Sequence, residues 1–126
     1  RQCLAALQAQ TTPLAAVWVI DNASTDGTQA AVAAMHWPAL VYRNTGKNLG
    51  GAGGFAYGTQ QAAQAEYDAL WLMDDDTIPE PQALEQLLAA DQALGGNYGW
   101  LSSRALAQDG TDQSPANHAL YGFAEL

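Results

Sequence analysis

The sequence predicts an α/β fold in which a mostly parallel sheet carries helices on both faces. Short apolar runs of strand length alternate with segments of helical character along most of the chain. Because successive positions in these runs are apolar, the predicted strands are buried on both faces, as in parallel sheets. Polar or glycine-rich clusters follow the runs, and parallel sheets bind ligands beyond the carboxyl ends of their strands. We therefore expect the clusters to converge on one crevice.

Helices separate and flank the expected strands. The expected strands are 16–20, 40–42 and 70–73, with a short candidate fourth strand at 100–101. The expected helices lie around Leu4 and Leu7, at about 28–35, at about 53–66, and after Pro79 and Pro81. Residues 109–112 are typical of a turn. This alternation, without internal repeats, predicts one domain over residues 1–126.

The composition is that of an acidic globular chain. Its 13 Asp and Glu against 4 Lys and Arg give a net charge of −9. This charge argues against a nucleic-acid surface, which needs a basic patch, and against adhesion to an anionic membrane. No apolar run reaches the length of a membrane span. An acidic chain that binds an anionic ligand needs a metal ion, backbone amides or a few placed cations.

The chain opens on a helical pattern at Arg1 and not on Met. We interpret it as a piece of a longer protein, with a sheet that is incomplete at both ends. Cys3 is the single cysteine, so an internal disulfide is excluded and a reducing compartment is compatible.

Three consecutive carboxylates, Asp74, Asp75 and Asp76, follow the apolar run at 70–73. In an extended chain, residues two apart point to the same side, so Asp74 and Asp76 can face the crevice together. Two carboxylates and phosphate oxygens suit Mg²⁺ or Mn²⁺, which prefer hard oxygen ligands. The alternative is a solvated loop whose carboxylates cap the next helix.

A further alternative for the triplet is an aspartate-nucleophile phosphatase, whose D-x-D-x-T/V motif also follows a strand. Asp74 would be the nucleophile and Asp76 the acid-base residue. The fifth position is Ile78 and not Thr or Val, and the glycine-rich segment upstream is not needed for that chemistry. A non-catalytic nucleotide-binding domain is the remaining alternative.

A cluster of turn and cap residues follows the first strand, with Asp21 at the strand tip and Asn22 next to it. A carboxylate at that position can accept hydrogen bonds from a base or a ribose. Ser24 and Asp26 also have a local explanation, since such side chains satisfy turn amides and cap helices. A calcium loop is rejected, because its twelfth position would be Ala33 where a bidentate Glu is required.

A polar, glycine-dense loop at residues 44–54 follows the second strand, and Arg43 and Lys47 supply two of the 4 cations around it. Glycine lets backbone approach a ligand closely, and amides at the start of the next helix can meet a phosphate. The alternative is a flexible connection. Residues 51–56 also fit the dinucleotide pattern G-x-G-x-x-A, but a long polar segment separates the first glycine from the strand end.

The two histidines are interpreted as structural. His36 ends a helix beside Trp37, where it caps or packs. His118 lies beyond the expected core; a metal-ligand role is open to it, but we favour none. The sequence leaves open whether a histidine supplies a third metal ligand.

Three segments, in order, resemble family 2 glycosyltransferases of the GT-A fold, a Rossmann-like architecture. They are residues 19–28 (VIDNASTDGT), 48–55 (NLGGAGGF) and 71–76 (WLMDDD). The glycine-rich stretch and the aspartate triplet resemble the galactofuranosyltransferase and rhamnosyltransferase branches in particular. The resemblance covers roughly residues 4–90.

The resemblance implies roles for the residues already singled out. Asp21 would contact the uracil or thymine base, and Asp75 would lie near the donor ribose or sugar. The implied nucleotide-sugar site comprises Asp21, Asn22, Ser24, Asn48, Gly50, Gly51, Gly54 and Asp75. The implied metal ligands are Asp74 and Asp76, which would hold Mn²⁺ or Mg²⁺ as a D-x-D pair.

The resemblance further implies an inverting, metal-dependent transfer of a sugar such as galactofuranose or rhamnose. The donor would be a UDP- or dTDP-sugar, and the acceptor a glycan or lipid-linked glycan in bacterial cell-wall polysaccharide synthesis. A cytoplasmic protein is implied, at the inner face of the membrane if the full-length protein is membrane-peripheral. The family's first strand is expected before Arg1 and the catalytic base beyond Leu126, so the catalytic residue is unknown and the fragment alone is expected to be inactive.

Overall fold

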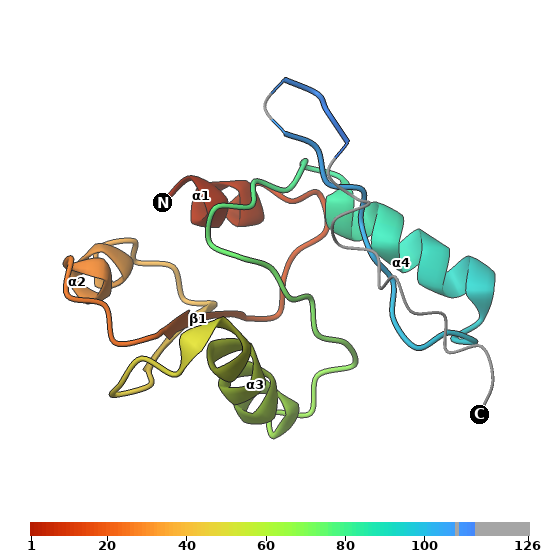
Figure 1. The fold of residues 1–126 in the computed structure, drawn as a ribbon. Helices are drawn as coiled ribbons and strands as arrows, with labels where there is room; N and C mark the ends of the chain where they lie inside the picture. Colours follow the sequence, from red (N-terminus) through yellow and green to blue (C-terminus); the bar gives the residue numbers. More distant parts are fainter. Residues whose placement is uncertain (108, 113–126) are drawn as a thin grey trace. The chain divides into compact units, whose positions relative to one another are not determined.

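The computed structural model describes residues 1–107 and 109–112. The chain divides into two compact units, Arg1–Pro81 and Gln82–Leu126, and each is described by itself (Figure 1). His118 lies outside the described residues. No helix in the described part of the chain is both long and apolar enough to cross a membrane.

The first unit is built from three helices and two strands. In chain order they are α1 (Gln2–Gln8), β1 (Val17–Asp21), α2 (Thr28–Ala33), β2 (Leu40–Asn44) and α3 (Gly50–Ala63). The two strands pair in parallel, with Val17 opposite Leu40 and Asp21 opposite Asn44. The predicted helices and the first two predicted strands are therefore confirmed, and the fold is mixed α/β with a small parallel sheet, consistent with the GT-A fold.

The helix α3 lies against β1 (Figure 1), and a glycine makes this approach possible. A Cβ atom added to Gly58 would come within 2.7 Å of Cγ1 of Ile20, which is closer than side chains tolerate. The absence of a side chain at Gly58 therefore sets the spacing between helix and strand.

The core of this unit lies between α1 and the start of β1. Cys3, Leu7 and Val17 are buried together. The partly buried residues packed against them include Leu4, Leu14, Trp37, Leu40, Trp71 and Met73. Two of these belong to the segment that was predicted as the third strand.

The prediction of a strand at 70–73 is wrong. The segment pairs with no strand in the described part of the chain, and its side chains alternate between core and solvent. Trp71 and Met73 pack on the core, whereas Leu70 and Leu72 are 39% and 55% exposed. An apolar run becomes a buried strand only where a neighbouring strand satisfies its backbone groups, and this segment has none.

The second unit contains α4 (Ala83–Leu94), which begins shortly after the prolines as predicted and ends at Gly95 in the left-handed conformation (φ +60°). The short strand predicted at 100–101 is absent from the described residues, because Trp100 is 69% exposed and pairs with no strand. The predicted turn at 109–112 is confirmed: the Thr111 amide donates to Oδ1 of Asp109 over 2.9 Å.

Candidate functional site

Asp21, the last residue of β1, is the most deeply buried charged group of the described chain, with 4% of its surface exposed. The backbone amide of Ser24 donates a hydrogen bond to its Oδ1 over 2.7 Å. The hydroxyl of Tyr42, which extends from β2, donates to its Oδ2. The carboxylate is thus held at the strand end from two directions.

These hydrogen bonds lower the pKa of Asp21, the bond from Tyr42 contributing most, while burial acts in the opposite direction. The same bond raises the pKa of the Tyr42 hydroxyl. Asn44 supports the pair, because its Nδ2 donates to the Tyr42 hydroxyl oxygen over 3.2 Å. Asp21 is therefore an anion at neutral pH.

Asn22 joins the end of β1 to the segment that leads into α3. Its Nδ2 donates to Oδ1 of Asn48 and to the carbonyl of Gly50, each over 3.1 Å. Its Oδ1 accepts from the Leu49 amide over 2.8 Å, and the Thr45 hydroxyl oxygen lies 3.3 Å from it. The structure thus brings Asn22, Asn48 and Gly50 together, as the sequence predicted.

The glycine-rich segment is more helical than predicted. The loop expected over 44–54 is shorter, since β2 extends to Asn44 and α3 already begins at Gly50. The reason is local: the side chain of Asn48 accepts the Gly50 amide over 2.8 Å, and Gly50, the first residue of the helix, takes a left-handed conformation (φ +72°). Gly51 and Gly54 therefore belong to the first turns of α3, not to a loop.

The local explanation for Asp26 is confirmed. Its Oδ1 accepts hydrogen bonds from the backbone amide and the hydroxyl of Thr28, the first residue of α2, over 3.1 and 2.6 Å. These bonds lower the pKa of Asp26. Ser24 is exposed, and both its backbone amide and its side chain hydrogen-bond to Asp21.

The aspartate triplet is not extended, and the geometry assumed for it is wrong. The Thr77 amide donates to the Asp74 carbonyl over 3.2 Å, which closes a turn with Asp75 and Asp76 at its centre. All three aspartates are exposed. An alternation of side chains two residues apart applies to a strand, so the pairing of Asp74 with Asp76 on one face does not follow from the backbone here.

The start of the triplet lies next to the buried Cys3 of α1. The Cys3 thiol lies 3.9 Å from the Asp74 carbonyl oxygen and 3.9 Å from Sδ of Met73. Burial raises the pKa of this thiol, and the charges of Asp75 and Asp76 raise it further. The thiol is therefore protonated and can donate to the backbone at the start of the triplet.

The described residues contain no group of three or more His, Cys, Asp or Glu side chains that could hold a metal ion. The exposed carboxylates of the triplet are nevertheless hard oxygen donors of the kind that Mg²⁺ and Mn²⁺ prefer. Such ions commonly take one or two protein carboxylates and obtain the remaining ligands from phosphate and water. The donor chemistry of the triplet therefore fits a metal shared with a diphosphate.

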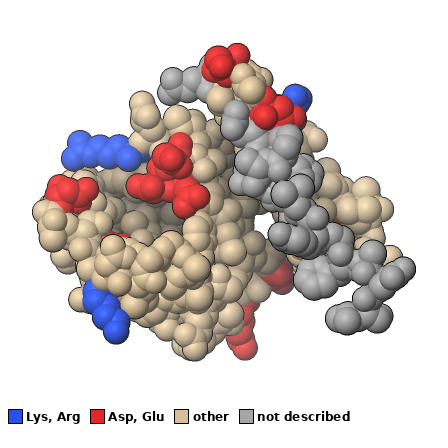
Figure 2. Space-filling model, viewed as in Figure 1, with Lys and Arg blue, Asp and Glu red and all other residues tan. Residues whose placement is uncertain are grey.

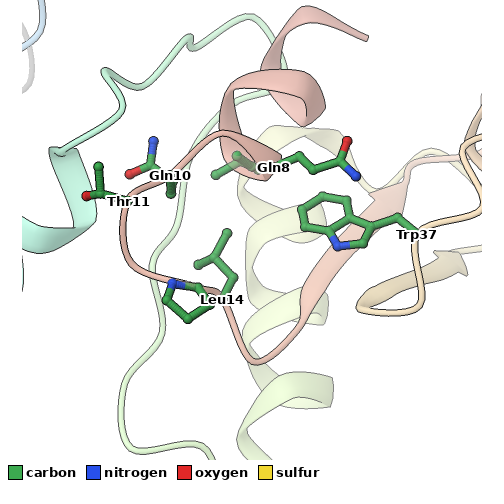
Figure 3. A pocket seen from close by; sticks show the side chains of 7 residues that line it. Gln8, Gln10, Thr11, Leu14 and Trp37 are labelled. Carbon is green, nitrogen blue, oxygen red and sulfur yellow. The ribbon is translucent and has the colours of Figure 1, made fainter.

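Acidic side chains gather at the edge of a hollow on the face of the first unit drawn in Figure 2. Two hollows of this unit are lined by other residues. One, of about 250 Å³, lies between α1 and Trp37, toward which Gln8 points in Figure 3. The other, of about 550 Å³, includes His36, Trp37 and Tyr42. Of the site residues, only the Asp21 partner Tyr42 reaches either hollow.

Residues 1–118 match the family model described as Glycosyl transferase family 2. The chain belongs to this family. No curated protein and no solved structure matches the chain significantly. Membership means a glycosyltransferase that uses a nucleotide-sugar donor and an acceptor, and it places the buried Asp21, the Asn22 contacts and the triplet in a transferase domain.

The sequence analysis missed two residues of this site, Tyr42 and Cys3. Tyr42 could have been found from its position two residues before Asn44, which puts both on the same side of β2 near the strand end. Cys3 carried no such signal, because its contact with Asp74 joins positions 71 residues apart.

Proposed function

We propose that this domain binds a UDP- or dTDP-sugar and serves an inverting, metal-dependent transfer of a sugar such as galactofuranose or rhamnose to a glycan or lipid-linked glycan. The observation that carries the proposal is Asp21, a buried anion at the carboxyl end of a parallel strand in a family 2 chain. Parallel sheets bind ligands at that edge. An ionised carboxylate at that edge is an acceptor for the imide N–H of uracil or thymine.

The glycine residues at the start of α3 are proposed to lie along the donor. Gly51 has open space where its Cβ would be, and a Cβ at Gly54 would only touch the Asn22 amide at 3.7 Å. The missing side chains therefore leave backbone accessible to a ligand. Asn48, Gly50, Gly51 and Gly54 are the proposed lining of this part of the site, with Ser24 near the base.

Asp74 and Asp76 are proposed to hold Mn²⁺ or Mg²⁺, and Asp75 to approach the donor ribose or sugar. Bound there, the ion would supply Lewis-acid stabilisation of the departing diphosphate. An anionic donor approaching a chain of net charge −9 needs such a cation. The acceptor hydroxyl would attack the anomeric carbon directly, giving inversion, while the bond from that carbon to the nucleoside diphosphate breaks and a general base takes the hydroxyl proton. The proposed setting is the cytoplasm, at the inner face of the membrane for a lipid-linked acceptor.

The test is titration calorimetry of the protein with UDP and with dTDP, each with and without Mn²⁺. We expect metal-dependent binding that Asp76→Ala weakens by at least about tenfold, a change of about 1.4 kcal/mol. Asp68→Ala removes an exposed carboxylate of the same unit outside the proposed site and is the matched control, expected to bind normally.

Equal binding with and without Mn²⁺ would remove the metal role of the triplet. Failure of both nucleotides to bind would contradict the proposal as a whole. Hydrolysis of p-nitrophenyl phosphate that Asp74→Asn abolishes would favour a phosphatase instead.

A further inference from the structure

The side-chain amide of Asn22 directs both of its donors and its oxygen to groups inside the protein. An Asn amide has two N–H donors and an oxygen that accepts. Both donors are engaged, by Asn48 and Gly50, and the oxygen accepts the Leu49 amide, with the Thr45 hydroxyl 3.3 Å away. The three amide distances, between 2.8 and 3.1 Å, are those of ordinary hydrogen bonds. A ligand that accepts from the Asn22 amide would have to displace Asn48 or Gly50.

The four partners belong to one short segment, residues 45–50, which connects β2 to α3. The backbone of the preceding residue attaches the same segment, since the Thr45 amide donates to the Asp21 carbonyl over 2.9 Å. The Thr45 hydroxyl also lies 2.7 Å from the Lys47 carbonyl oxygen, which closes the turn on itself. The contacts at Leu49 and Gly50 come from the Asn22 side chain, and they lie where α3 begins.

We propose that Asn22 is a positioning residue: its amide holds residues 45–50 against the end of β1 and so fixes where α3 begins relative to Asp21. The inference rests on the proposed function, since the positioned elements are the proposed donor pocket. The family resemblance implied that Asn22 contacts the nucleotide sugar. In the role proposed here, Asn22 instead supports the groups that make that contact.

The chemistry of the contacts explains why an amide is needed. A carboxylate could accept from Leu49 and Thr45 but could not donate to Asn48 Oδ1 or to the Gly50 carbonyl, and it would face both acceptors with a negative charge. In Asn22→Ala, the partners in residues 45–50 would lose their contacts with the side-chain amide of residue 22. The two substitutions therefore disturb different parts of the segment.

The first measurement is amide hydrogen exchange by NMR on the free protein, for wild type, Asn22→Ala and Asn22→Asp. In Asn22→Ala we expect exchange at Leu49 and Gly50 to be faster by about tenfold, the effect of losing about 1.4 kcal/mol of local protection. In Asn22→Asp the Leu49 amide keeps its acceptor and stays protected, whereas the Gly50 amide, bonded to the released Asn48 side chain, exchanges faster. Asn97→Ala, an exposed position in the second unit, is the control and leaves both amides unchanged.

The second measurement is calorimetry with UDP and Mn²⁺ on the same variants, after far-UV circular dichroism has verified that each is folded. We expect affinity for UDP to fall in the order wild type, Asn22→Asp, Asn22→Ala, in step with the loss of protection. Unchanged exchange at Leu49 and Gly50 in a folded Asn22→Ala would overturn the inference. So would a loss of UDP affinity without faster exchange, because that result would mean direct contact with the nucleotide.

The two proposals can fail separately. If wild type binds neither UDP nor dTDP, the proposed function fails, while the exchange pattern still decides whether Asn22 holds the segment. If wild type binds UDP and Asn22→Ala binds it equally well despite faster exchange, the positioning role fails and the proposed function stands.

Discussion

Two acidic clusters of this protein follow apolar runs in the sequence, and the structure treats them in opposite ways. Asp21 ends a paired strand, is 4% exposed, and receives hydrogen bonds from Ser24 and Tyr42. The triplet at 74–76 follows an unpaired segment, is exposed, and is closed by one turn hydrogen bond. A carboxylate next to a strand end becomes buried and oriented only when a neighbouring strand brings partners to it.

The difference indicates different roles in binding. Asp21 is oriented before any ligand arrives, so it can select a ligand group by direction. The three adjacent carboxylates of the triplet repel one another, and solvation in an exposed turn keeps that repulsion small. A divalent cation would relieve it, so we expect the triplet to become ordered with its ligand and Asp21 to change little. Substitutions in the two clusters should therefore differ in their effect on stability.

Replacement of the buried carboxylate should have the largest effect. Asp21→Ala leaves the Tyr42 hydroxyl and the Ser24 amide without their acceptor, and we expect the free energy of unfolding to fall by about 2–3 kcal/mol. Urea denaturation followed by circular dichroism measures it. Asp75→Ala is the matched change in the triplet and should leave stability within about 0.5 kcal/mol of wild type; similar losses in both variants would contradict the contrast.

The packing that supports the β1 region should respond next. Gly58→Ala puts a Cβ atom 2.7 Å from Ile20, and we expect overpacking to lower the free energy of unfolding by about 1–2 kcal/mol. Gly51→Ala in the same helix meets no atom within 4 Å and should instead stabilise the protein by up to about 1 kcal/mol, because alanine is the better helix former. Thermal unfolding of the two variants should therefore shift in opposite directions.

The pH dependence of stability should carry the signature of Asp21. The pKa of Asp21 is lower in the folded state than in the unfolded state, so ionised Asp21 stabilises the fold. This stabilisation is fully present above the unfolded pKa of about 3.9 and is lost as the pH falls through the folded pKa. Tyr42 acts at the other end, because its raised pKa gives stability that is lost as pH rises above about 10.

Urea denaturation between pH 2 and pH 7 measures how the free energy of unfolding falls in acid. We expect this fall to be smaller in Asp21→Asn than in wild type. The remainder belongs to groups such as Asp26 and Asp109, whose pKa values are also lowered by their own hydrogen bonds. A wild-type acid slope retained in full by Asp21→Asn would contradict the assigned cause.

Neutralising a carboxylate of the triplet should have the smallest effect on stability. Asp75→Asn removes one of three like charges, and we expect the free energy of unfolding to rise by no more than about 0.5 kcal/mol at low salt. The gain should vanish at high salt because the charges are exposed and screened. Denaturation curves at two salt concentrations test this, and a loss above about 1 kcal/mol would mean that the turn is held by Asp75 itself.

Local chemistry made much of this molecule predictable. Asp26 accepts hydrogen bonds from the first residue of α2, and Gly95 ends α4 in the left-handed conformation, each through contacts a few residues apart. The loop at 44–54 was predicted too long. The Asn48 side chain accepts the Gly50 amide and so starts the helix at Gly50, whereas the many glycines of this segment suggested a loop. Residues 70–73 could not be assigned from the local sequence, because their apolar residues suit a strand. Whether they form one depends on a neighbouring strand that pairs with them.

Sequence patterns were enough to predict the family, the helices and the first two strands of the first unit, and the residues at the two acidic positions. These follow from periodicity, caps and motifs, which act over a few residues. Three contacts became known only from the folded structure: Tyr42 orients Asp21, the segment entering α3 hydrogen-bonds to the Asn22 amide, and Cys3 contacts the backbone beside the triplet. Those contacts join residues 21, 27 and 71 positions apart, and whether they form depends on how packed elements meet in space, which no local pattern encodes.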